Sequence, residues 1–154
     1  MSSLASKGLY GVVFNYTIIT SGSVQFIGNI DLFPSHNLMV ENNVAKEQVV
    51  TSTLWYDNSL YNLCSKNIYV LKTPGVTANS VTVVGLVPGM GKVAVSGNLF
   101  MSENNFTKID RNFIQDDVAL IESRKKVICL ADWIVPANGS PVIVTRSMKN
   151  GVGC

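Results

Sequence analysis

The stretch that decides the fold is Ser80–Asn98, SVTVVGLVPGMGKVAVSGN, in which a Pro-Gly-Met-Gly segment separates two valine-rich runs. Valine and threonine favour a pleated, half-buried surface, so the runs Ser80–Val87 and Lys92–Asn98 are predicted strands. The proline fixes one φ angle and the glycines permit positive φ, as a tight turn requires. The segment is therefore predicted to form a β-hairpin.

The rest of the chain follows the same pattern of short apolar runs separated by Gly, Asn and Pro. Seven further strands are predicted, at Gly11–Thr20, Ser23–Leu32, Gln48–Trp55, Asn67–Lys72, Asp117–Ile121, Lys126–Leu130 and Pro141–Thr145. Helix is expected only as a turn or two within Asn42–Gln48 or Thr53–Leu63. Without a repeat or a linker, residues 1–154 are predicted to form one all-β domain, an antiparallel barrel or sandwich.

The composition argues against several classes of partner. Hydrophobic residues make up 47% of the 154 residues, charged residues only 14%, and the net charge is +2. Such a charge does not suit a strong nucleic-acid or anionic-membrane binder, and the only basic cluster is Arg124–Lys126. No run is long enough for a membrane span, and the first residues lack the apolar centre of a secretion signal. An intracellular location is expected.

The residues that commonly bind metals are few. The chain has one histidine and three scattered cysteines, Cys64, Cys129 and Cys154, with no Cys-x-x-Cys pair. Neither a disulfide framework nor an ordinary zinc site can be predicted from such a set. We expect no metal and no cofactor.

The single histidine, His36, is the only candidate for an imidazole general base, and it follows an apolar, strand-like run. The paired carboxylates Asp116 and Asp117 do not suggest an alternative acid–base pair, because neighbouring residues of a strand point to opposite faces. A lone histidine is more often structural than catalytic. Both interpretations of His36 stay open at this point.

Three segments carry a resemblance to a known family: Phe26–Leu38, Asn67–Pro74 and Pro136–Val144. In order and spacing they resemble the base, acid and nucleophile segments of picornavirus-type chymotrypsin-like proteases. The resemblance implies a two-barrel antiparallel fold and hydrolysis of peptide bonds in a polyprotein, without metal or cofactor. By this analogy the protein would be virus-derived and would reside in the host cytoplasm or the virion.

The resemblance also implies roles for individual residues. His36 would be the general base, and Asp57 or Asn67 the group that orients it. The turn Asn138, Gly139 and Ser140 would supply the nucleophile and oxyanion region. Asn67 and Asn138 are amides where the family has an acid and a nucleophile. The domain is therefore predicted to be an inactive or degenerate protease.

Two other functions remain open. Low charge and high β content also suit a viral or phage structural protein, such as a coat, tube or decoration subunit that self-assembles through β-rich surfaces. A single-strand nucleic-acid-binding barrel is the weaker alternative, because the charge is near neutral. The expected partners are a polypeptide substrate or copies of the chain itself, with nucleic acid unlikely and no membrane.

Overall fold

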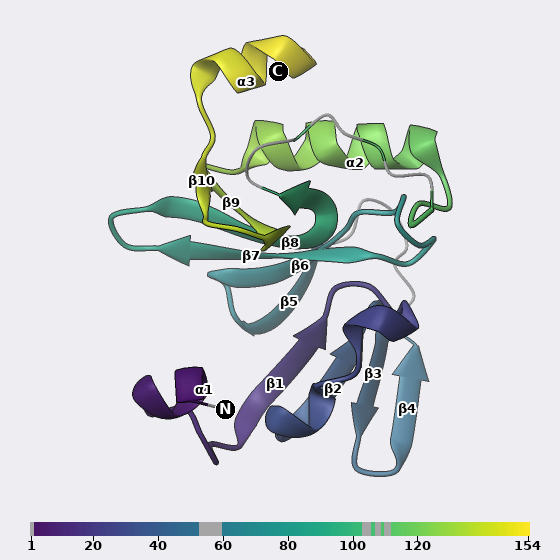
Figure 1. Ribbon diagram of the computed structural model, residues 1–154, viewed down its shortest axis with the longest axis vertical. Helices are drawn as coiled ribbons and strands as arrows, with labels where there is room; N and C mark the ends of the chain where they lie inside the picture. The colour runs from purple at the N-terminus through teal and green to yellow at the C-terminus, as the bar shows by residue number, and fades with distance from the viewer. Residues whose placement is uncertain (1, 53–59, 103–105, 107–108, 110–111) are drawn as a thin grey trace.

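The structure is a computed structural model that describes residues 2–52, 60–102, 106, 109 and 112–154. Its strands form two sheets, and two helices cover one face of the larger sheet (Figure 1). The elements in chain order are α1 (Ser2–Ser6), β1 (Phe14–Ile19), the 3-10 turns η1 (Val24–Phe26) and η2 (Ile30–Leu32), β2 (Ser35–Val40), β3 (Asn43–Lys46), β4 (Val49–Ser52), β5 (Leu60–Ser65), β6 (Ile68–Lys72), β7 (Val81–Val87), β8 (Gly91–Ser102), α2 (Asp117–Leu130), β9 (Trp133–Asn138), β10 (Val142–Ile143) and α3 (Arg146–Val152).

Both sheets are open and mixed. The four-stranded sheet has the order β1-β2-β3-β4, and the six-stranded sheet has the order β10-β9-β8-β7-β6-β5. The pairs β1–β2 and β8–β9 are parallel, and the other described pairs are antiparallel. The prediction of a β-rich chain is confirmed. The prediction of an antiparallel barrel, including the two-barrel arrangement, is wrong, because neither sheet closes and each contains a parallel pair.

The hairpin predicted from Ser80–Asn98 is confirmed. Strands β7 and β8 pair antiparallel up to Val87 and Gly91. The Met90 N–H donates to the Val87 carbonyl oxygen at 3.0 Å. Gly89 and Gly91 both have φ of 79°, the positive value for which glycine is suited. Local turn chemistry was therefore sufficient to place this element.

Helix α2 occupies the place of two predicted strands, Asp117–Ile121 and Lys126–Leu130. The Asp116 carboxylate caps the helix by accepting from the Ala119 N–H at 2.9 Å. The buried residues of the helix recur at helical spacing: Leu120, Ser123, Arg124, Val127 and Ile128. Two of these buried residues are polar, which conceals the helical period of the apolar ones. The β-branched residues at either end then favour the wrong interpretation as strands.

Other predicted boundaries also differ from the structure. The predicted strand Ser23–Leu32 contains the two 3-10 turns instead. Asn42–Gln48, considered as a helical turn, contains β3, and the alternative Thr53–Leu63 lies partly outside the described residues and then enters β5. Strands β2 and β9 were not predicted. Helix α3 is closed by Gly153 at φ of 76°.

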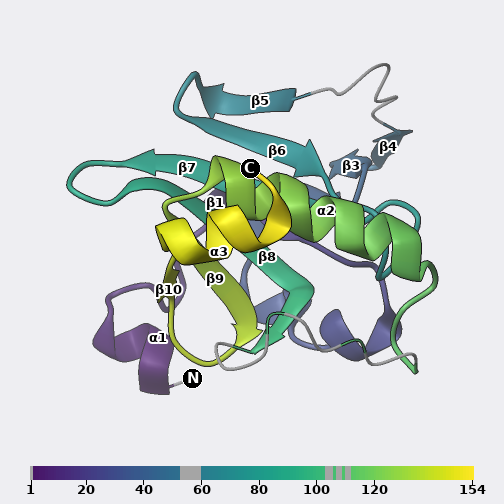
Figure 2. The same cartoon turned by 90° about the horizontal axis from the view of Figure 1, so that it is seen from above.

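Two apolar layers hold these elements together. The smaller layer lies between the two sheets and contains Met39, Val70 and Val81. The larger layer lies between the six-stranded sheet and the helices, which Figure 2 shows lying across that sheet. Its buried members include Leu71, Val84, Ala94, Phe100, Leu120, Val127 and Ile134. The order of layers is therefore sheet, sheet and helices.

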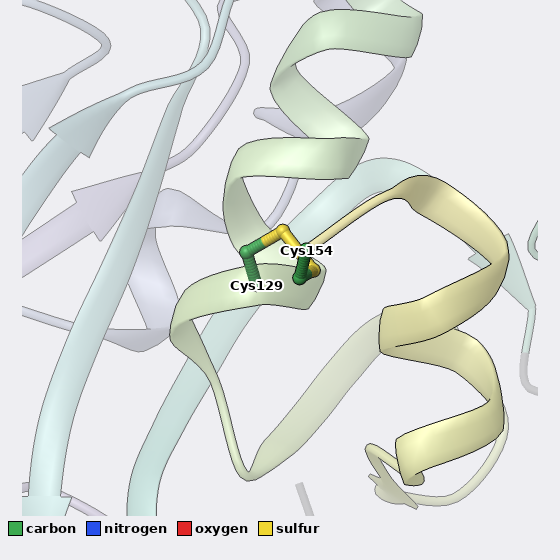
Figure 3. Close-up of a disulfide and its surroundings, with 2 residues drawn as sticks. All are labelled: Cys129 and Cys154. Atoms are coloured by element: carbon green, nitrogen blue, oxygen red, sulfur yellow. A yellow bond between two sulfur atoms is a disulfide. The ribbon is translucent and has the colours of Figure 1, made fainter.

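A disulfide joins Cys129 of α2 to Cys154, the residue that follows the α3 cap, with the Cα atoms 5.5 Å apart (Figure 3). The sequence did not predict this bridge. It closes a loop with a sequence separation of 25 residues. The bridge holds the end of α3 against the last turn of α2.

Reduction of this bridge is expected to lower the free energy of unfolding by at most about 3.5 kcal/mol, because the unfolded chain regains the entropy of the open loop. Urea unfolding with and without dithiothreitol measures the loss. The Cys154→Ser variant should show the same loss and no further response to the reductant. A thiol titration of the denatured, unreduced chain that finds three thiols instead of one would contradict the bridge.

Candidate functional site

A polar part of the interior lies where the two sheets meet. Three segments converge there: the end of β1, the two-residue loop between β2 and β3, and the loop between β6 and β7. The Val81 N–H donates to the Thr20 carbonyl oxygen at 2.9 Å, which links the sheets directly. The Glu41 N–H donates to the Ile19 carbonyl oxygen at 2.9 Å, which holds the β2–β3 loop beside β1.

A group of side chains, here called the junction cluster, fills this place; it consists of Ser21, Gly22, Ser23, Glu41, Thr77 and Ser80. The half-buried carboxylate of Glu41 is its centre. Glu41 Oε1 accepts from the Gly22 N–H at 2.8 Å and from the Thr77 hydroxyl. One carboxylate oxygen therefore contacts a segment of each sheet.

The hydroxyl groups of the cluster continue this network. The Thr77 and Ser80 hydroxyl oxygens lie 2.7 Å apart, and Ser80 Oγ also accepts from the Thr77 N–H at 3.0 Å. Ser21 and Ser80 are only 3% and 5% exposed. Buried polar groups are costly unless they are hydrogen-bonded, and the Thr77 and Ser80 hydroxyl groups are hydrogen-bonded within the cluster.

Asn98 of β8 is a further buried polar residue, next to Gly97. A Cβ atom at position 97 would collide with the Thr20 hydroxyl oxygen, so β8 approaches the end of β1 closely there. Asn98 is 7% exposed, and its side-chain nitrogen has no hydrogen-bond partner within the described part of the chain. An amide N–H donates, so it requires an acceptor such as a water oxygen rather than a cation.

The residues present do not fit a catalytic metal ion. Across residues 2–52, 60–102, 106, 109 and 112–154, no three His, Cys, Asp or Glu side chains lie together in a way that could hold a metal. Hydroxyl and amide groups surround the single carboxylate of the junction cluster. Protein sites for zinc use His, Cys, Asp and Glu, and the entire sequence has one histidine. The described residues therefore offer no metal-dependent reaction step.

A hydroxyl group can act as a nucleophile only with a base, a group that orients the base and donors for the oxyanion. Thr77 has the Glu41 carboxylate beside it, and that carboxylate already accepts from Gly22. No imidazole takes part in the described hydrogen bonds of the cluster. The geometry suits a structural connection better than nucleophilic catalysis.

A cavity of about 490 Å³ lies on the helical side of the larger sheet. Apolar side chains dominate its lining, with Arg124 and Lys125 as the charged members; the others are Phe106, Ile109, Ile121, Ile128, Met148, Gly151 and Val152. Arg124 is 5% exposed, and its Nε donates to the Leu99 carbonyl oxygen at 2.7 Å. The cavity offers volume for an apolar group, and its described lining contains no hydroxyl or thiol side chain.

The structure places the predicted site residues in different parts of the fold. His36 is exposed on β2 of the four-stranded sheet, and its side chain forms no hydrogen bond or ion pair with the described residues. Asn67 lies in the β5–β6 turn of the other sheet. Asp57 lies outside the described residues. His36 therefore has no described contact with a group that could orient it.

The predicted nucleophile turn lies at the end of β9. The Asn138 side-chain nitrogen donates to the Met101 carbonyl oxygen at 3.2 Å. Gly139 and Ser140 follow it on the exposed connection to β10. No described hydrogen bond joins this turn to His36. The roles given to these residues depend on the protease resemblance and stay predictions.

The sequence interpretation did not identify the junction cluster. Glu41 and Thr77 are 36 residues apart, and Gly22 and Glu41 are 19 apart. No spacing rule connects such positions. The one available signal was a glutamate followed by two asparagines between apolar runs, which is consistent with a hairpin loop.

No protein-family model matches the chain. An uncharacterized protein of Caenorhabditis elegans is 30% identical over all of this chain and 43% of its own length. Metallo-beta-lactamase domain-containing protein 1 of Xenopus laevis is 27% identical over 98% of the chain and 64% of that relative. The human protein of the same name is 28% identical over 95% of the chain and 55% of that relative. The chain thus spans about half the length of the curated relatives it matches.

Solved structures show the same likeness. A metallo-β-lactamase of Hirschia baltica has a TM-score of 0.57 at 11% sequence identity, over 90% of this chain and 66% of that one. The B3 metallo-β-lactamase BLEG-1 has a TM-score of 0.57 at 14% identity, over 96% of this chain and 78% of that one. At such identities the likeness concerns the fold.

These findings overturn the functional part of the sequence interpretation. The named vertebrate relatives are metallo-beta-lactamase domain-containing proteins, and the similar structures are metallo-β-lactamases. The predicted viral protease and the alternative viral structural or nucleic-acid-binding proteins are therefore wrong. The expected location in the host cytoplasm or the virion has no support. No helix in the described part of the chain is long and apolar enough to cross a membrane. The chain shares the fold of metallo-β-lactamases rather than that of chymotrypsin-like proteases.

Proposed function

We propose that this chain is a domain built on the metallo-β-lactamase hydrolase fold whose 154 residues do not assemble a catalytic metal centre of their own. The likeness to two metallo-β-lactamases and to metallo-beta-lactamase domain-containing proteins supports the hydrolase type. The absence of a metal centre is inferred from the residues that could bind a metal. The sequence has one histidine, which is exposed on β2 without a described partner.

A metal-dependent hydrolase usually needs at least three protein ligands around its ion. The described residues contain no such group, and the junction cluster uses its one carboxylate for hydrogen bonds between segments. By this proposal the isolated chain does not carry out metal-dependent hydrolysis. A polypeptide partner, which came from the protease resemblance, and binding to copies of the chain, which came from composition, stay predictions.

The second candidate function is a metal-dependent hydrolase whose ligands come from residues outside this sequence. The lengths of the curated relatives favour it, because the chain corresponds to only 43% to 64% of each relative. The two candidates agree on the fold and differ in whether metal binds to a longer polypeptide.

Metal analysis of the purified chain tests the proposal. After incubation with zinc and dialysis, we expect clearly less than one equivalent of zinc by mass spectrometry, and hydrolysis of a chromogenic β-lactam at the rate of buffer alone. The His36→Ala variant should behave identically. One tightly held equivalent, together with turnover that a chelator abolishes, would contradict the proposal. Stoichiometric zinc in a longer form, but not in the 154 residues, would favour the second candidate.

A further inference from the structure

Glu41 has an unusual backbone conformation. It is the first residue of the two-residue loop between β2 and β3, and its φ is 55°. This left-handed region is unfavourable for residues with a Cβ atom, and hairpin loops normally place Gly, Asn or Asp there. Such a conformation costs free energy, which other interactions of the folded chain must offset.

Glu47 provides a comparison within the same chain. It is the first residue of the next two-residue loop, between β3 and β4, and its φ is also 55°. Glu47 is exposed, and its carboxylate forms no hydrogen bond or ion pair with the described residues. The two glutamates therefore share a backbone angle and differ in what their side chains contact.

The Glu41 carboxylate contacts two segments that no local interaction would bring together. Gly22 follows β1 of the four-stranded sheet, and Thr77 lies in the loop that enters β7 of the six-stranded sheet. The fit around Gly22 is close, since a Cβ atom there would lie 3.2 Å from Glu41 Cδ. Hydrogen bonds to a charged acceptor are among the stronger ones in proteins.

We propose that Glu41 joins the two sheets through these bonds and that the junction needs no metal ion. The fold is named for metal-dependent enzymes, and the residues present do not fit a metal. A carboxylate bonded to a backbone N–H and a hydroxyl connects the sheets instead. This inference does not depend on the proposed function.

The two glutamates allow a test based on Tm. A glycine substitution raises Tm by relieving backbone strain and lowers it by removing a side-chain contact. Glycine relieves the strain at either position. Glu47→Gly should therefore leave Tm unchanged or raise it by a degree or two, whereas Glu41→Gly should lower Tm by about 5 °C despite the relieved strain. Glu41→Gln keeps Oε1 as a neutral acceptor and should fall between Glu41→Gly and the parent chain. Equal Tm changes for the two glycine variants would overturn the proposal.

A second variant covers the case in which Glu41→Gly does not fold. Thr77→Val removes one hydroxyl and keeps a similar shape, so it should lower Tm by about 2–4 °C. It should also speed hydrogen exchange at the Val81 amide, which donates across the junction to Thr20. Unchanged Tm and unchanged exchange at Val81 would overturn the proposal.

A separate measurement tests whether the junction needs a metal ion. The Tm of the parent chain should be the same in excess chelator and in excess zinc chloride, because a ligand that binds only the folded state would raise it. A rise with zinc that Glu41→Gln abolishes would show that the carboxylate is a metal ligand and would overturn the metal-free junction. A failure of the proposed function, such as turnover by the chain, would leave the comparison of Glu41 with Glu47 unaffected.

Discussion

Replacing Gly75 by alanine is expected to destabilise the fold by about 4 kcal/mol, through backbone strain together with a steric clash in the core. Gly75 has φ of 138°, which residues with a side chain rarely adopt. A Cβ atom there would lie 2.5 Å from Leu120 Cα and 2.7 Å from Leu120 N. These are backbone atoms of α2, and Leu120 is fully buried, so the helix must move as a whole.

The position of Gly75 makes that movement costly. Its carbonyl oxygen accepts from the N–H groups of Gln115 and Asp116, at 2.9 and 3.0 Å, and Asp116 caps α2. The neighbouring Pro74 carbonyl oxygen accepts from the Ser123 hydroxyl at 2.7 Å. A shift of the helix by a few tenths of an ångström would weaken these bonds together, because all of them join the same loop to the same helix.

Urea unfolding followed by circular dichroism measures the effect of Gly75→Ala. The matched control is Gly85→Ala in β7, where φ is not positive and no atom lies within 4 Å of the added Cβ. That variant should change stability by less than about 1 kcal/mol, because alanine replaces a flexible residue in a strand without a clash. If both variants unfold at the same urea concentration, the close approach of α2 to Gly75 is wrong.

Contacts between neighbouring segments of the chain could be predicted from the sequence, and contacts between distant segments could not. The β7–β8 hairpin was predictable because its strands and turn are adjacent in the chain. Helix α2 was not, because Ser123 and Arg124 lie on its buried face. Their partners are carbonyl oxygens of Pro74 and Leu99, 49 and 25 residues away. Polar residues look surface-exposed in a sequence when the groups that satisfy them are distant.

The candidate site also depends on contacts between residues that are distant in the sequence. His36 was the candidate general base because it is the only histidine in the chain, yet the structure leaves it exposed. Glu41, which joins the two sheets, is an ordinary glutamate in the sequence. Its importance comes from Gly22 and Thr77, which only the folded chain brings to it. Residue type alone indicates chemistry, and tertiary contacts decide whether that chemistry can occur.

Phe100→Ala is expected to cost about 3–5 kcal/mol, since it removes a large, fully buried side chain and leaves a cavity. The Phe100 ring lies with its centroid 4.7 Å from that of Phe106. The guanidinium carbon of Arg124 lies 5.7 Å from the Phe100 centroid. Burial lowers the pKa of Arg124, yet an arginine stays protonated at any ordinary pH. The ring therefore contacts a buried positive charge as well as filling space.

Two controls separate these contributions. Phe100→Leu retains most of the volume and loses the ring, so it should cost less than about 2 kcal/mol if space filling dominates. Phe33→Ala removes a ring that is 37% exposed and should cost clearly less than Phe100→Ala. Chemical unfolding of the three variants gives the comparison. Because the buried cation has its Nε bonded to Leu99, a loss for Phe100→Leu as large as that for Phe100→Ala would mean that the contact between ring and guanidinium, rather than core volume, stabilises this part of the sheet.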